Sequence, residues 1–525
     1  MKAAYRMGNI SVPGVKETVA PIEDLIQLED YVDFSELNGG VGAALLSNNR
    51  KLQYKFGFEL ETTVHPTLPL EAIETTVTSV LDGIKRMPLN ESITVVQRVV
   101  PDNSRRLKYY GELARNSPNP LFSEIVKSAA SPLQYFVDLD PHRKRAIARQ
   151  RYKRKRTYIY VTATPSDSSS GIRSKSDAVI KKAVSLTEKL LSFVGVDIET
   201  DENSLENIFR EAEGIYENWV NVLEQMGLGL TPLTMNQMVE IQWKEFNNTP
   251  VQSLPQYIEW DGKTVNYNQY DDIHVSSWMF SDQYSTPKAS RNFVWRNRAN
   301  GEKAITGIVT LKNKPAQWKN AKAQLQYLYK KCKGLEDYSI VLTFTKASEH
   351  VVKRNIELVQ RQAKDCQRSA EKKGLPSNFS ARIEKEAAEA ENAIYEGDVP
   401  VNMSLAVAIT KPTKKELEAA CKSFSQRFPL PATLEIEREY TAITWMQCFP
   451  QLSYNSPLFA PYRRTRGYKA SCIPAFMPVM SAGSPDDKGL EFITADEMIP
   501  YYIDILSEQS IRHMLFSAIT RSGKS

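Results

Sequence analysis

The sequence is poor in the residues that build disulfide frameworks and zinc sites. Only five cysteines occur among 525 residues, and no two of them stand at CxxC spacing. The five histidines are equally isolated, with none in an HExxH arrangement. These spacings argue against a disulfide framework and a structural zinc site. The cysteines and histidines are therefore expected to occupy core and ordinary surface positions.

Long apolar runs are missing as well. No stretch approaches the ~18 consecutive apolar residues of a transmembrane helix. The first residues, Met1 to Arg6, do not begin the apolar core of a secretory signal. Hydrophobic residues make up 42% and charged residues 25%, values ordinary for globular proteins. A chain of this length is expected to hold about three or four domains and to remain in the cytoplasm.

Acidic residues are absent from one strongly basic segment. The whole chain has 67 basic and 62 acidic residues, a net charge of +5. From 143 to 156, nine of fourteen residues are basic: Arg143, Lys144, Arg145, Arg149, Arg151, Lys153, Arg154, Lys155 and Arg156. Three interpretations stay open: a solvated helix end before a strand, a contact with an anionic membrane surface or membrane partner, and a contact with nucleic acid. Tyr152 is the one interleaved aromatic residue, which disfavours single-strand stacking.

Periodic apolar patterns predict two successive sets of strands and helices. The first set comprises a strand at 54–60, a helix at 70–85, a strand at 93–96, helical segments at 121–151, a strand at 158–162, a helix at 177–193 and a short strand near 196. The second comprises strands at 305–311, 338–344, 405–409 and 434–436, with helices at 316–329 and 414–428. The expected fold class is α/β, built from ferredoxin-like βαβ units with helical insertions.

The insertion in the second set has the rhythm of a coiled coil. A 4-3-4-3-4 spacing links Val352, Ile356, Val359, Ala363, Cys366 and Ala370. After a turn at Gly374 and Pro376, the rhythm resumes at Ile383, Ala387, Ala390 and Ile394. An antiparallel helical hairpin is predicted. It either packs on its own domain or projects to contact a partner.

One motif carries a chemical mechanism. The segment from Ala518 to Ser525 matches the phosphate-binding loop G-x-x-x-x-G-K-[ST], with alanine in place of the first glycine. A short apolar run, Met514 to Phe516, precedes it as the strand that such a loop requires. The predicted nucleotide-binding residues are Ala518, Thr520, Arg521, Ser522, Gly523, Lys524 and Ser525.

Each residue type in this loop has a role in binding ATP and Mg²⁺. Backbone N–H groups around Gly523 would point at the phosphates, and Lys524 would reach the β- and γ-phosphates. The Ser525 hydroxyl would ligate Mg²⁺. The carboxylate and water-positioning residues of such an ATPase would follow Ser525. The chain is therefore expected to be the N-terminal part of a larger ATP hydrolase, truncated at the motif, with no catalytic residue of its own and inactive alone.

These features together predict five segments. They are an N-terminal extension at 1–50, a first α/β unit with a helical insertion at 51–200, a helical and irregular connector at 201–300, a second α/β unit at 301–440 with the hairpin at 349–396, and the start of a P-loop NTPase domain at 441–525.

A long α/β region before a late phosphate-binding loop resembles the conjugal-transfer ATPases of type IV secretion systems, of the TraC, TrbE and CagE type. Besides the loop, the similarity rests on Ile308 to Pro315, the hairpin, the stretch from Trp445 to Pro450, and the approach through Gly489, Thr494 and His513 to Leu515. The resemblance implies that the loop opens a RecA-like domain. It also implies ATP-driven pilus assembly and transfer, a homo-oligomer, docking on inner-membrane components, and a cytoplasmic location peripheral to the inner membrane.

Three function classes remain from the sequence. The first is a transfer ATPase of type IV secretion. The second is a DNA-translocating P-loop motor that uses the basic segment on its track, although such coupling proteins usually begin with transmembrane helices. The third is a non-catalytic scaffold, if the natural chain ends at Ser525.

Overall fold

A computed structural model gives the fold. It describes residues 8–12, 15–19, 26–37, 39–48, 51–60, 68–89, 91–101, 104–128, 153–165, 198–247, 251, 253–268, 275–279, 287–297, 303–313, 315, 318, 320–372, 378–438, 440–453, 464–481, 490–493 and 500–503. The chain divides into two compact units. One comprises residues 1–98 and 156–480, and the other comprises 99–155 and 481–525.

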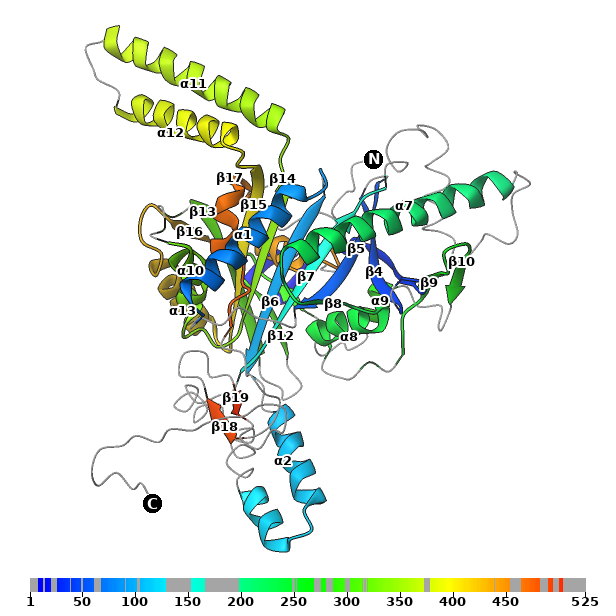
Figure 1. Cartoon of the computed structure of the whole chain (residues 1–525). Coiled ribbons are helices and arrows are strands. Elements are labelled where there is room, and N and C mark those ends of the chain that lie inside the picture. Colours follow the sequence, from blue (N-terminus) through cyan, green and yellow to red (C-terminus); the bar gives the residue numbers. More distant parts are fainter. Residues whose placement is uncertain are drawn as a thin grey trace, which may run out of the picture. The chain divides into compact units, whose positions relative to one another are not determined.

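A large, mostly antiparallel sheet dominates the described residues (Figure 1). The sheet has 15 strands. Twelve of them follow the order β10 (Val265–Asn268), β9 (Tyr257–Trp260), β3 (Leu28–Phe34), β4 (Val41–Asn48), β5 (Lys51–Leu60), β7 (Lys153–Ala163), β6 (Ser92–Pro101), β14 (Tyr338–Lys346), β15 (Pro400–Lys411), β13 (Lys303–Asn313), β12 (Val294–Asn297) and β11 (Lys288–Ala289). The other three each pair with a strand of this path: β8 (Leu230–Pro232) with β5, β16 (Thr433–Ile436) with β13, and β17 (Arg466–Lys469) with β15. β3 and β9 pair in parallel. The expected mixture of α and β structure is confirmed.

Two smaller strand pairs lie outside this sheet. β1 (Gly8–Val12) pairs with β2 (Val15–Val19), and β18 (Leu490–Ile493) pairs with β19 (Pro500–Ile503), both antiparallel. The unit that contains β18 and β19 also contains α2 (Ser104–Asn116).

The two halves of the large sheet have matching connectivity. In the first, β5, α1 (Leu70–Arg86) and β6 are followed by β7, α7 (Ile198–Gln225) and β8, and the strand order is β8-β5-β7-β6. In the second, β13, α10 (Ala321–Cys332) and β14 are followed by β15, α13 (Lys414–Gln426) and β16, and the strand order is β16-β13-β15-β14. The halves join where β6 meets β14, and there the hydroxyls of Thr94 and Thr343 lie 3.0 Å apart.

Helices cover both faces of the sheet. α1, α7, α10 and α13 pack on one face, where Phe56 meets Tyr216 of α7 with ring centroids 4.8 Å apart. The other face carries α8 (Met235–Phe246), α9 (Val275–Met279) and α14 (Thr441–Met446), joined through Trp243 and neighbouring aromatic side chains. Glycine at position 42 permits this packing, because a Cβ there would lie 2.4 Å from the Met235 nitrogen.

The structure groups several segments differently from the predicted division. Residues 28–48, predicted as an extension, form β3 and β4 within the sheet, since their apolar residues complete its core. α7, predicted in a connector, is the second helix of the first half. Residues 441–480, predicted to open a new domain, belong to the unit that holds the sheet, where α14 and the 3₁₀ helix Ala470–Ala475 are buried against it. The predicted helix at 177–193 lies outside the described residues.

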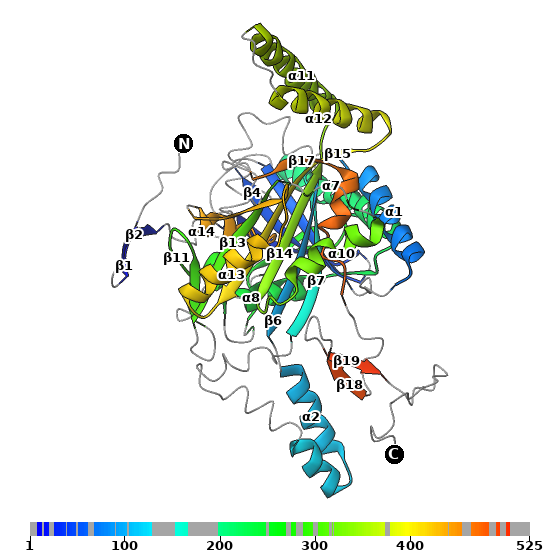
Figure 2. The ribbon, with the colours of Figure 1, turned by 90° about the vertical axis from the view of Figure 1, so that its left-hand side faces the viewer.

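The predicted hairpin is present and projects away from the sheet (Figures 1 and 2). α11 (Glu349–Lys372) leaves β14 and α12 (Asn378–Tyr395) returns into β15. Ala363 and Ala387 are buried between the two helices. Of the two alternatives left open by the sequence, the projecting one therefore describes the arrangement.

The predicted seam is only partly right. Val352, Ile356, Ile383, Ala390 and Ile394 are half-buried between the helices. Val359 and Cys366, predicted within the seam, are exposed instead. A single partner helix covers one narrow stripe, and these two residues lie at its edge.

Candidate functional site

The sequence-predicted nucleotide site is not part of the described structure. Ala518, Thr520, Arg521, Ser522, Gly523, Lys524 and Ser525 all lie outside the described residues. The same holds for Arg143, Lys144, Arg145, Arg149 and Arg151 of the basic segment. Nucleotide and Mg²⁺ binding therefore stay predictions from the sequence.

The last four residues of the basic segment belong to strand β7, not to a helix end. Lys153 is buried, whereas Arg154 is exposed. Arg156 lies 3.5 Å from the Glu59 carboxylate and donates to the Tyr158 hydroxyl at 3.4 Å. Successive side chains of a strand point to opposite faces. These four residues therefore do not form one continuous basic face, and the helix-end interpretation is wrong for them.

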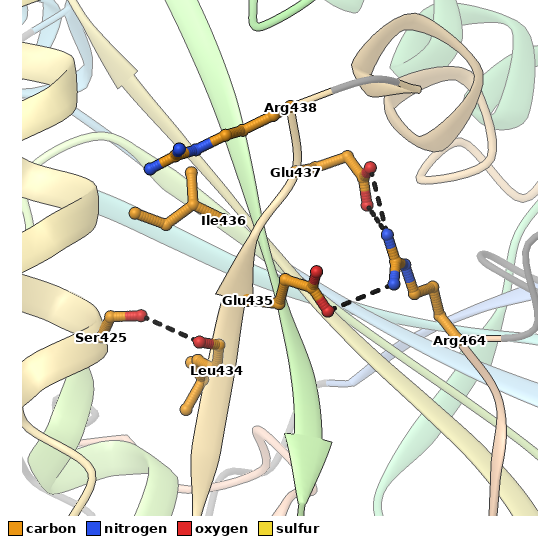
Figure 3. Close-up of a pocket in the computed structure, with 7 residues that line it drawn as sticks. All are labelled: Ser425, Leu434, Glu435, Ile436, Glu437, Arg438 and Arg464. Atoms are coloured by element: carbon orange, nitrogen blue, oxygen red, sulfur yellow. Dashed lines mark hydrogen bonds and ion pairs between the residues drawn. The ribbon is translucent and has the colours of Figure 1, made fainter.

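A groove beside β16 is one candidate site among the described residues. It has a volume of about 500 Å³ and lies between α13, β16 and Arg464, the first residue of the described segment 464–481 (Figure 3). Its lining consists of Ser425, Leu434, Glu435, Ile436, Glu437, Arg438 and Arg464. No spacing in the sequence marks these residues, because the groove joins side chains from three separate segments.

Local structure positions the strand that lines this groove. Thr413 caps α13 by accepting a hydrogen bond from the Glu416 nitrogen at 3.3 Å, which fixes where the helix begins. At the other end of α13, the Ser425 hydroxyl donates to the Leu434 carbonyl at 3.4 Å. This bond satisfies one carbonyl of β16 and partly closes the edge of the strand.

A charge cluster forms the wall of the groove. Glu435 and Glu437 stand two residues apart on the chain, so both reach the same guanidinium. Arg464 lies 3.2 Å from each carboxylate, and Lys312 lies 3.6 Å from Glu435. The Glu437 side chain is almost fully buried, and the buried Nε of Arg464 has no hydrogen-bond partner among the described residues.

The lining of the groove is mostly polar and charged. The lining includes no histidine, cysteine or lysine. Arg464 pairs with both carboxylates, and Lys312 is a second cation beside Glu435. What the groove offers is a polar surface beside a short strand, with Arg438 exposed at its rim. Such a surface suits a polar segment of a partner protein.

A second polar cluster lies under the sheet, at Lys55. Its amine is buried and donates a hydrogen bond to the Ser453 carbonyl. Burial lowers the pKa of this amine from 10.5 to about 7. Nearby, Gln451 accepts from the Tyr31 hydroxyl and donates to the Tyr160 hydroxyl, both at 3.1 Å. These bonds attach residues 447–453 to the sheet.

The described residues lack two other kinds of site. They contain no group of three or more histidine, cysteine or acidic side chains placed to hold a metal ion. Within the same part of the chain, no helix has the length and apolar character needed to cross a membrane. Comparison with known proteins gives no identification: no protein-family model and no curated protein matches the chain.

Proposed function

We propose that the chain is the docking part of an ATPase that energises conjugative transfer and pilus assembly by a type IV secretion system. The observation that carries this proposal is the phosphate-binding pattern from Ala518 to Ser525, placed after a long α/β region. The described residues would supply contact surfaces, and the P-loop would supply the nucleotide site. In a RecA-like domain, Lys524 and Ser525 would hold the phosphates of ATP and its Mg²⁺.

The connectivity of the sheet supports the proposal at the level of domains. Each half has the succession β-α-β-β-α-β, and its fourth strand lies beside its first, as in a ferredoxin-like unit. We infer that the two halves are such units fused through β6 and β14. An extended sheet with a projecting arm gives a large surface for docking, which suits a protein held peripherally at the inner membrane by partner components.

The alternative of a DNA-translocating motor gains little from the described part of the basic segment. Arg156 is paired with Glu59 and Lys153 is buried, which leaves the exposed Arg154 and the partly exposed Lys155 as accessible cations of this part. Residues that release counterions from DNA phosphates need an accessible charge. The transfer ATPase therefore remains the better proposal.

A genetic experiment tests the proposal in the organism that carries the gene. Deleting the gene should abolish conjugative transfer from that donor, and the intact gene supplied in trans should restore it. A Lys524→Ala gene should fail to restore transfer, because the lysine would contact the transferred phosphate in the transition state. Lys333→Ala, on the turn after α10, is the matched control and should restore transfer fully.

Two outcomes would overturn the proposal. Transfer that survives the deletion would show that the protein has no role in it. Full restoration by the Lys524→Ala gene would show that the loop does not act on ATP. Immunoblots of each strain establish that the variants accumulate equally.

A further inference from the structure

The projecting helix α11 has an exposed stripe without charge. Seven residues form this uncharged stripe, and all of them are exposed: Val351, Asn355, Leu358, Val359, Gln362, Cys366 and Ser369. At 100° per residue they fall within an arc of about 100° on the helix. Three of them are large apolar side chains, and Val351 is 55% exposed.

The rest of α11 differs sharply from this stripe. Ten of its 24 residues are charged, and helical geometry places all ten on the remaining arc. The seam with α12 does not explain the stripe, since that seam passes through Ile356 and the buried Ala363. The stripe lies on an arm that extends away from the sheet (Figure 2). Its composition therefore suits a contact outside its own chain.

The spacing within the stripe is that of a helix-pairing surface. Val351 and Leu358 are seven residues apart, and so are Asn355 and Gln362. Apolar and amide layers thus alternate in a 4-3-4 rhythm, which is the pattern of a second coiled-coil seam on the same helix.

The chemistry of the stripe selects a second copy of the chain as the partner. When identical surfaces meet across a two-fold axis, a cluster of like charges on one copy faces the same cluster on the other and is repelled. The stripe has no charge, so it avoids this repulsion. The amides of Asn355 and Gln362 carry both donors and acceptors, so each can bond its own counterpart. An anionic lipid surface would need basic residues on the stripe, and a charged peptide would need complementary ones.

We propose that the α11 helices of two copies pair through the uncharged stripe, so that the two hairpins form an intermolecular helical bundle. This pairing needs no nucleotide, and it stands whether or not the proposed function is correct. It gives the projecting arm a defined role as a dimer contact.

Sedimentation velocity of the full chain over a concentration series tests the pairing. The wild-type chain should dimerise. Leu358→Lys and Gln362→Lys should each weaken the dimer at least about tenfold, because each buries a charge against its own copy. Asn392→Lys places the same charge on an exposed position of α12, outside the stripe, and should leave the dimer unchanged. Far-UV circular dichroism establishes that each variant keeps its helices.

Cross-linking provides an independent readout. Cys366 is exposed and the other four cysteines are buried, so a long bis-maleimide should join two copies through Cys366. The product should vanish in Cys366→Ser, fall in Leu358→Lys and persist in Asn392→Lys. A wild-type chain that stays monomeric would overturn the proposal. So would a dimer that both stripe variants leave intact.

Discussion

Replacing Lys55 by methionine should raise the stability of the protein near neutral pH and make that stability less dependent on pH. The amine lies under the sheet, and its described hydrogen bond goes to the Ser453 carbonyl, an uncharged acceptor. Methionine has a similar length and carries no charge. The substitution therefore removes the cost of burying an ammonium group while keeping most of the packing.

The magnitude follows from the pKa of the amine. Burial lowers it from 10.5 to about 7, which corresponds to about 4–5 kcal/mol against the charged form. Between these two pH values the unfolded chain binds the proton and the folded chain does not, so stability rises with pH. From pH 7 to pH 9 this linkage adds about 2 kcal/mol to the free energy of unfolding. Loss of the donor to Ser453 costs about 1–3 kcal/mol at every pH.

Melting temperatures of the wild type and Lys55→Met at pH 7, 8 and 9 measure the effect. The variant should melt higher than the wild type at pH 7, and the gap should shrink or reverse by pH 9. Taking the difference cancels the other titrating groups, such as Asp30, whose pKa burial raises to about 7. Lys85→Met changes the same charge at an exposed site and should show a small, pH-independent difference. A gap for Lys55→Met that does not change with pH would refute the reasoning.

Two further predictions concern packing and charge. Gly42→Ala should lower the melting temperature of the sheet unit, because its Cβ would meet the Met235 backbone at 2.4 Å. Gly214→Ala has open space around it on α7 and should raise stability by about 0.5–1 kcal/mol. Calorimetry of both variants checks this contrast, and equal effects would contradict it. Arg464→Ala should destabilise the chain by about 1–3 kcal/mol because it leaves the buried Glu437 carboxylate unpaired. Adding Glu437→Gln to Arg464→Ala should recover part of that loss in the same measurement, and a double variant no more stable than the single one would argue against the pairing.

The sequence predicted best where a local pattern decides the structure. Alternation of apolar residues anticipated β13 and β14, and the coiled-coil rhythm anticipated both helices of the hairpin. The same rhythm wrongly placed Val359 and Cys366 in the seam with α12. It marks a wide apolar face of α11 but does not indicate which part of that face the partner helix covers. The uncharged stripe could be found only after that coverage was known.

Contacts between distant segments could not be predicted from the sequence. Lys55 and Ser453 are 398 residues apart, and no pattern in either segment indicates that they meet. β3 and β4 fall within the extension predicted at 1–50 and were missed, because their place in the sheet depends on the pairing of β3 with β4 and of β4 with β5. The groove beside β16 was missed because it too joins residues that are distant in the sequence. Arg464 bonds to Glu437, which is 27 residues away along the chain.

The root of the projecting arm has a mechanical consequence. α11 and α12 leave the sheet from β14 and β15, which pair with each other over nine residues, from Tyr338 opposite Ile409 to Lys346 opposite Val401. A pull on the arm along these strands draws both in the same direction, so the ladder between them carries almost no load. The load falls on the outer ladders, which join β14 to β6 and β15 to β13 and, at the root of the arm, β15 to β17. It acts on the hydrogen bonds of these ladders in shear. The arm is thus anchored in the middle of the sheet and can transmit force without unzipping its own base.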